Sequence, residues 1–174
     1  MLTTLNKDLV ANATRAYQVG DYNTAARLFG EAAVAFQENS NFLDAAEMKN
    51  NQSVALLQAG NARAACDVVK GTAQVFQDAN DFRRQGMAFG NEAAALNAMG
   101  RMDSAADLYR AAADSFEKVG EDQLRSTVMQ ALAGIQLRKG KIMEALLSMS
   151  VGLSGVKNPT LKQKILRGLL KFRV

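Results

Sequence analysis

The sequence predicts an all-α fold, a solenoid of about four helix pairs followed by a C-terminal amphipathic helix. The main observation is a period of forty residues, in which a glycine recurs with an alanine five positions after it: Gly20 and Ala25, Gly60 and Ala65, Gly100 and Ala105, Gly140 and Ala145. A fixed period in this range is typical of stacked repeats. The second observation is that Pro159 is the only proline in 174 residues. Long helices can therefore run without the interruption that an internal proline causes.

The first repeat shows how each pair is expected to form. Leu2, Leu5 and Leu9 recur at spacings of three and four, which gives one apolar stripe along a helix. Gly20 suits the C-terminal end of that helix, because glycine readily takes the left-handed conformation found there. A second helix is expected from Tyr22. The recurring alanine lets the two helices of a pair approach closely.

The later repeats follow the same plan, and the last one departs from it. Helices are expected near residues 42–59, 62–76, 82–99, 102–116, 122–139 and 142–153. Phe36, Phe76 and Phe116 lie forty apart, but Val156 follows them, so the fourth repeat is degenerate, as terminal repeats often are. We assign residues 1–155 to the repeat domain, with units of about 1–40, 41–80, 81–120 and 121–155. Residues 156–174 form a basic amphipathic helix, in which Asn158 is expected to be the cap and Pro159 the first helical residue.

The repeats resemble those of the tetratricopeptide repeat family. Two runs carry the resemblance: Gly20-Asp21-Tyr22 with Ala25, Phe29 and Ala32, and Gly100 with Ala105, Tyr109 and Ala112. The forty-residue period, and Gln37, Gln77 and Glu117 in place of a closing proline, indicate a long-helix subclass. Asn80-Asp81 followed by Gly90-Asn91 and Gly100 is similar to the repeats of Pins-type scaffold proteins. Kinesin light chains and soluble NSF attachment proteins are more distant comparisons. The resemblance covers residues 1 to about 153.

The resemblance implies a right-handed superhelix in which the first helix of each pair lines a concave groove. It also implies the residues that bind a partner there: Tyr17, Glu47, Asn50, Asn51, Leu57, Met87, Gly90, Asn91 and Asn97. The matching positions of the fourth repeat are Thr127, Gln130, Gly134 and Leu137. In Pins-type repeats asparagines hold the main chain of an extended peptide, and Asn51 and Asn91 match that column. The alternative is that the asparagines cap and bridge helices and that Met87 and Gly90 are packing residues.

The positive charge of the chain is concentrated in its tail. Residues 157–174 hold six basic and no acidic side chains, whereas the other 156 residues hold 15 basic and 17 acidic ones. Such asymmetry indicates an attachment segment. The candidate attachment residues are Lys162, Lys164, Arg167, Lys171 and Arg173. The tail either lies on an anionic membrane or an acidic partner, or docks its leucine stripe on the last repeat as a cap, with the charges in water.

Composition argues against several functional classes. The chain has no histidine, which removes the most common general base and zinc ligand, and its one cysteine, Cys66, cannot form a thiolate metal site or an intramolecular disulfide. We therefore expect no enzymatic activity, no cofactor and no metal. Phe172 is the only aromatic residue beside the basic tail, so nucleic acid is a weak candidate. No apolar run approaches the length of a membrane span, and we expect a cytoplasmic protein.

The leading prediction is a non-catalytic scaffold or adaptor that binds an extended or helical segment of another protein in the concave groove. The alternative is a peripheral membrane or complex-assembly subunit that is attached through its basic C-terminal helix. A third alternative is a structural subunit whose alanine-rich outer faces pack in an oligomer.

Overall fold

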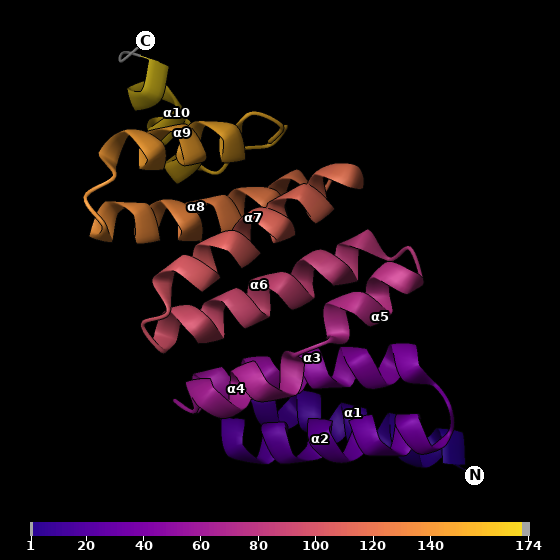
Figure 1. The fold of residues 1–174 in the computed structure, drawn as a ribbon. Helices are drawn as coiled ribbons and strands as arrows, with labels where there is room; N and C mark the ends of the chain where they lie inside the picture. Colours follow the sequence, from indigo (N-terminus) through magenta and orange to yellow (C-terminus); the bar gives the residue numbers. More distant parts are fainter. Residues whose placement is uncertain (1, 172–174) are drawn as a thin grey trace.

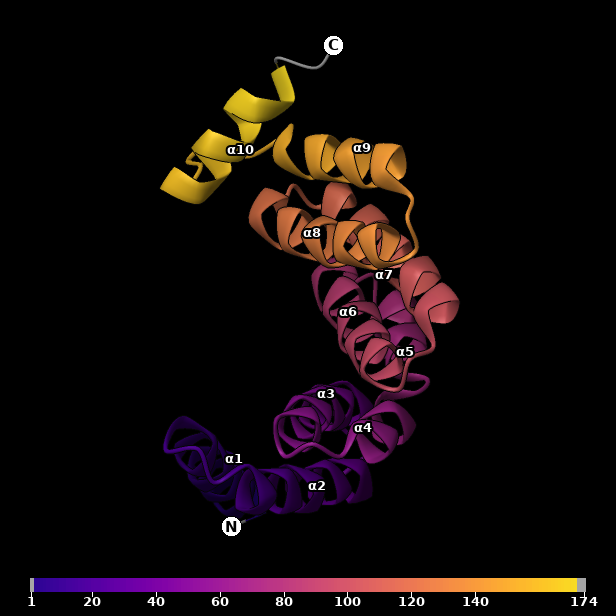
Figure 2. The ribbon, with the colours of Figure 1, turned by 90° about the vertical axis from the view of Figure 1, so that its left-hand side faces the viewer.

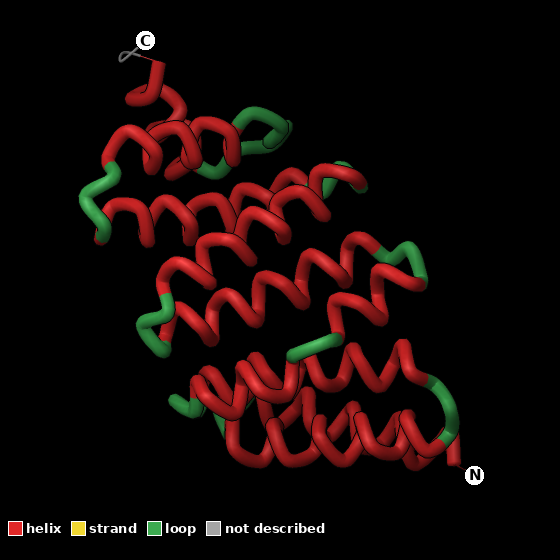
Figure 3. Tube along the Cα trace, in the orientation of Figure 1, coloured by secondary structure: helices red, strands yellow, loops and turns green. Residues whose placement is uncertain are grey.

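The computed structural model describes the backbone of residues 2–171 and the side chains of residues 7–161 and 163–168. Over that range the chain forms helices joined by short connections, and no strand occurs in it (Figures 1 and 3). The helices are α1 (Leu2–Gln18), α2 (Tyr22–Glu38), α3 (Phe42–Gln58), α4 (Ala62–Val69), α5 (Thr72–Asp78), α6 (Phe82–Ala98), α7 (Met102–Lys118), α8 (Asp122–Arg138), α9 (Ile142–Leu153) and α10 (Leu161–Lys171). The all-α prediction is confirmed.

The helices stack along an arc. Figure 2 shows α1, α3, α6 and α8 on the inner side of the arc, with α2, α4, α5, α7 and α9 on the outer side. Each inner helix packs on the outer helix of its own repeat, and α3, α6 and α8 also pack on that of the preceding repeat, so burial is shared between neighbours. The prediction of a solenoid of helix pairs is therefore confirmed.

The glycines of the forty-residue period end the first helix of each pair. Gly20, Gly60, Gly100 and Gly140 have φ between 73° and 83°, the left-handed region that side chains other than glycine rarely take. The alanines that follow them at the fifth position are fully buried where the two helices of each pair meet. The repeated glycine and alanine thus position the two helices of every pair.

The second repeat departs from the plan, because the helix expected over residues 62–76 is broken into α4 and α5. Lys70 takes an extended conformation with ψ of 132°, and Gly71 has φ of 80°. The buried Thr72 hydroxyl donates to the Val69 carbonyl at 2.7 Å and to Asn50 Oδ1 of α3 at 3.1 Å. The polar groups that the break leaves inside the protein are therefore hydrogen-bonded, as buried polar groups must be.

The start of the last helix also differs from the prediction. The Thr160 hydroxyl accepts from the Gln163 backbone N–H at 3.3 Å, and Gln163 Oε1 accepts from the Thr160 N–H at 2.9 Å. This is a capping box, and the first helical hydrogen bond runs from the Lys164 N–H to the Thr160 carbonyl. Thr160 is therefore the cap. The expected roles of Asn158 as the cap and Pro159 as the first helical residue were wrong.

Candidate functional site

The inner side of the arc carries a hollow at its N-terminal end. Thr14 and Tyr17 of α1 and Asn51 and Val54 of α3 line it, with the buried ring of Phe29 behind them, and its volume is about 260 Å³. Each pair lies three residues apart on its helix, which places both side chains on one face. The sequence-predicted residues Tyr17 and Asn51 are thus brought together.

The side chains of this hollow combine apolar and polar surface. The Tyr17 ring packs edge-on against Tyr22, with centroids 5.4 Å apart, which holds the phenol in place. The Thr14 hydroxyl donates to the Val10 carbonyl of its own helix at 2.8 Å. Asn51 is half-buried, and its amide can both donate and accept. The hollow suits an uncharged ligand with hydrogen-bonding groups.

An ion pair joins the inner helices α3 and α6. Arg84 of α6 donates to Glu47 of α3 at 2.8 Å and to Asp81 at 2.6 Å, and its guanidinium lies 5.2 Å from the centre of the Phe76 ring. Burial by itself would raise the pKa of Asp81, but the hydrogen bonds and charge of Arg84 outweigh it, so the pKa is lowered. The predicted binding residue Glu47 is thus engaged in joining two repeats.

The other predicted groove residues fall into three environments. Asn50 is buried and accepts the hydrogen bond from Thr72. Asn97 Oδ1 accepts from Arg138 of α8 at 2.5 Å, and Met87 Sδ accepts from Arg83 at 3.6 Å. The remaining three are partly buried on the same helices: Leu57, Gly90 and Asn91. Asn50 therefore faces the interior, whereas Asn51 next to it faces the first hollow.

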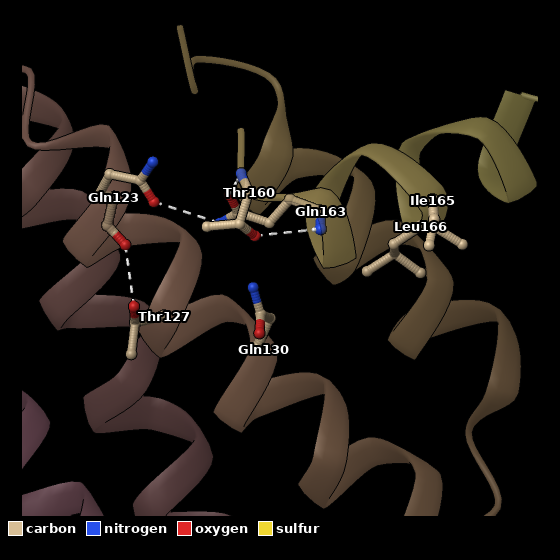
Figure 4. A pocket seen from close by; sticks show the side chains of 7 residues that line it. All are labelled: Gln123, Thr127, Gln130, Thr160, Gln163, Ile165 and Leu166. Atoms are coloured by element: carbon tan, nitrogen blue, oxygen red, sulfur yellow. Dashed lines mark hydrogen bonds between the residues drawn. The ribbon is translucent and has the colours of Figure 1, made fainter. Parts of the chain in front are cut away.

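A second hollow, of about 500 Å³, lies between α8 and α10 (Figure 4). Its lining residues are all uncharged: Gln123, Thr127, Gln130, Thr160, Gln163, Ile165 and Leu166. The Gln163 amide donates to Gln123 Oε1 at 3.2 Å and to Ser126 Oγ at 3.3 Å, which ties α10 to α8. Gln130 also donates to Ser126 Oγ, at 3.2 Å.

Sequence reasoning located only part of this second hollow. Thr127 and Gln130 stand at positions implied by the family resemblance, but Gln123, Thr160 and Gln163 were missed. The missed signal is the Thr160-x-x-Gln163 capping box, which places the start of α10. Of the predicted attachment residues, Arg173 and the side chains of Lys162 and Lys171 lie outside the described residues. Arg167 is half-buried and Lys164 is exposed.

Comparison with known proteins identifies the family. The profile of the soluble NSF attachment proteins matches residues 6–171, which is nearly the whole chain. The chain belongs to the soluble NSF attachment protein family. None of the curated protein sequences matches it closely enough to count as a relative.

A solved structure with the same fold is that of BtubC (BKLC) from P. vanneervenii. The TM-score is 0.77 at 14% sequence identity, and the match covers 98% of this chain and 73% of BtubC. Together with the attachment protein profile, this likeness confirms a helical repeat fold of the tetratricopeptide type. It does not extend to the Pins-type subclass.

Family membership supports a protein-interaction role. Over residues 2–171, the helices lack the combination of length and apolar character that crossing a bilayer requires.

Proposed function

We propose that this member of the attachment protein family is a non-catalytic scaffold that binds an extended or helical segment of another protein along the inner side of the arc. The observation that carries the proposal is the pair of hollows on the inner helices, one between α1 and α3 and one between α8 and α10. Both combine an apolar wall with amide and hydroxyl groups and lack ionisable side chains, apart from the Tyr17 phenol. A polypeptide main chain with apolar side chains has the complementary chemistry.

Asparagine and glutamine are suited to holding a main chain, because one side chain can donate to a peptide carbonyl and accept from a peptide N–H. Asn51 in the first hollow and Gln130 in the second supply such amides. The Pins-like asparagine column supports the same use of Asn51 and Asn91. Glu47 would act indirectly, since its pairing with Arg84 sets the spacing between α3 and α6.

We place the scaffold in the cytoplasm. Burial raises the pKa of the Cys66 thiol and keeps it unreactive, and the chain has no second cysteine with which to form an internal disulfide. A helical domain without disulfides is typical of a reducing compartment.

The test is site-specific photocrosslinking followed by affinity measurement. A photoreactive phenylalanine derivative at Tyr17 should capture a protein from cell extract that the same residue at Val34, exposed on α2, does not capture. The crosslinked segment is then identified and made as a peptide. Asn51→Ala should weaken its binding about tenfold, because a good side-chain hydrogen bond contributes about 1 kcal/mol and its partner would be left unpaired.

Val34→Ala serves as the control and should leave peptide affinity and helicity unchanged. Equal crosslinking from Tyr17 and Val34, or an affinity that Asn51→Ala does not alter, would refute binding in the first hollow.

A further inference from the structure

The C-terminal helix α10 docks on the repeats through its polar residues. Gln163 is among the few buried polar side chains of the molecule, and its amide bonds to Gln123 and Ser126 of α8. Arg167 donates to the backbone carbonyl of Leu153, where α9 ends, and to that of Val156 in the connection after it. The bond to Leu153 satisfies a carbonyl that the helix end would otherwise leave free. α10 therefore contacts the solenoid through polar side chains, Gln163 and Arg167, whereas a docked amphipathic helix normally exposes its polar side chains to water.

The exposed side of α10 is correspondingly apolar. Leu161 is 76% exposed and Ile165 is 58% exposed, although they lie one helical turn apart and are two of the five residues of the apolar stripe that was expected to dock, which are Leu161, Ile165, Leu166, Leu169 and Leu170. Leu166 alone of the described apolar side chains on this helix is half-buried. We predicted that the leucine stripe docks on the last repeat and leaves the charges in water. At Leu161 and Ile165 the prediction is wrong, because both side chains are exposed.

Positive charge accompanies this apolar side. Lys164 is exposed between Leu161 and Ile165 in the sequence, and Lys157 is exposed in the connection before the helix. Residues 157–174 hold no acidic side chain. The acidic residue next to this segment is Asp122 at the start of α8, which is half-buried and lies against Gly155. Figure 2 places α10 at one tip of the arc, beside α8 and α9.

We propose that α10 is a contact site for an anionic lipid surface, with Leu161 and Ile165 entering the interfacial region and Lys157 and Lys164 meeting the headgroups. Exposed apolar side chains flanked by lysine are the pattern of helices that lie in a membrane interface. An anionic bilayer is complementary to both the apolar side chains and the lysines, because its apolar interior lies beneath a negatively charged surface. Such contact requires no hydrogen-bond partners at fixed positions. One short helix with few anchors gives weak and reversible attachment.

This site shares Ile165 with the second hollow, and its other residues lie outside the proposed peptide-binding face. Leu161 and Lys164 do not line either hollow, so their substitution can test lipid contact without altering peptide binding. Both side chains are exposed, and their substitution leaves the core intact.

The experiment is co-sedimentation of the full chain with phosphatidylcholine vesicles, with and without phosphatidylserine. The full chain should bind the serine-containing vesicles at low salt and lose binding as salt is raised, because screening weakens attraction at a charged surface. Leu161→Ser should lower the partition coefficient about fivefold through lost apolar burial. Lys164→Glu should lower it by more than tenfold, since each charge near the surface is worth roughly a factor of five.

Val19→Ser is the matched control, because Val19 is 75% exposed but lies in the turn between α1 and α2, in the first repeat. It should bind vesicles as the unaltered chain does, and circular dichroism should show equal helicity in all variants. Absence of binding at low salt, equal binding to neutral vesicles, or unchanged binding by Leu161→Ser would overturn the proposal. Light scattering adds a further decisive outcome: a dimer of the full chain that Leu161→Ser dissociates would assign the apolar side to self-association and overturn lipid contact.

Discussion

The second and third repeats have the same glycine and alanine spacing but different backbones. In the third repeat α7 runs without interruption from Met102 to Lys118, whereas in the second the matching helix is divided by Lys70 and Gly71. The third repeat has Arg110 and Ala111 at the positions of Lys70 and Gly71. A glycine with φ of 80° ends one helix and begins another, while alanine continues it.

The break changes how the large aromatic residue of each repeat packs. In the third repeat a Cβ atom at Gly86 would come within 2.8 Å of the Phe116 ring, so the continuous helix leaves no room for a side chain there. In the second repeat the equivalent position is Ala46, which packs in one cluster with Phe76. The divided helix therefore accommodates a methyl group that the continuous one excludes.

Each repeat also has its own buried polar contact between the paired helices. In the second repeat Thr72 bonds to Asn50, and in the third the Ser115 hydroxyl donates to Gln85 Oε1 at 3.3 Å. The two contacts use different positions of the repeat. The same spacing of glycine and alanine is thus compatible with a divided helix in the second repeat and a continuous helix in the third. Which of the two forms depends on small residues such as Gly71 and Ala111.

The largest expected effect is the loss of stability when Phe116 or Phe76 is replaced by alanine, and it should differ between the two residues. Phe116→Ala should destabilise the protein by about 3–5 kcal/mol, because the ring is buried and its removal leaves a cavity beside a glycine. Phe76→Ala should cost less, since the methyl group of Ala46 occupies part of that space. Urea unfolding followed by circular dichroism measures both. A greater loss for Phe76→Ala would show that the break does not loosen the second repeat.

A smaller loss of stability is expected from adding a methyl group at Gly86, where the backbone of α6 lies close to the Phe116 ring. Gly86→Ala should destabilise by about 2 kcal/mol, because the new methyl group must displace the Phe116 ring. Gly90→Ala, on the same helix, is the matched control: its Cβ would lie 3.6 Å from Val128, an ordinary contact, and it should stabilise by up to about 1 kcal/mol through helix propensity. Similar shifts of the denaturation midpoint in both variants would contradict the packing difference.

The smallest effect concerns the polar bridge at the break. Thr72→Val keeps the shape of the side chain but leaves Asn50 Oδ1 and the Val69 carbonyl without their donor, so we expect a loss of about 1 kcal/mol. Thr127→Val removes a similar hydroxyl from an exposed position and should change stability little. The measurement is the midpoint temperature of thermal unfolding for each variant. Equal midpoints for Thr72→Val and Thr127→Val would mean that water replaces the lost donor at the break.

The candidate site was predicted unevenly. Tyr17 and Asn51 stand where the family resemblance places them, and they meet in the first hollow. Asn50 differs from Asn51 by one residue, which on a helix is a rotation of about 100°. That rotation turns Asn50 inward to Thr72, and helical periodicity alone does not say which of two adjacent asparagines finds a buried partner.

The sequence by itself determined the helix pairs, the glycine turns inside them and their forty-residue stacking, because glycine turns, buried alanines and apolar periodicity act locally and recur in each repeat. The tertiary structure decided the division of α4 from α5 and the side of α10 that docks. Both depend on partners far along the chain: Asn50 lies 22 residues from Thr72, and Gln123 lies 40 residues from Gln163. A local pattern cannot show which distant donor or acceptor will satisfy a buried polar group, and only the folded chain brings the two together.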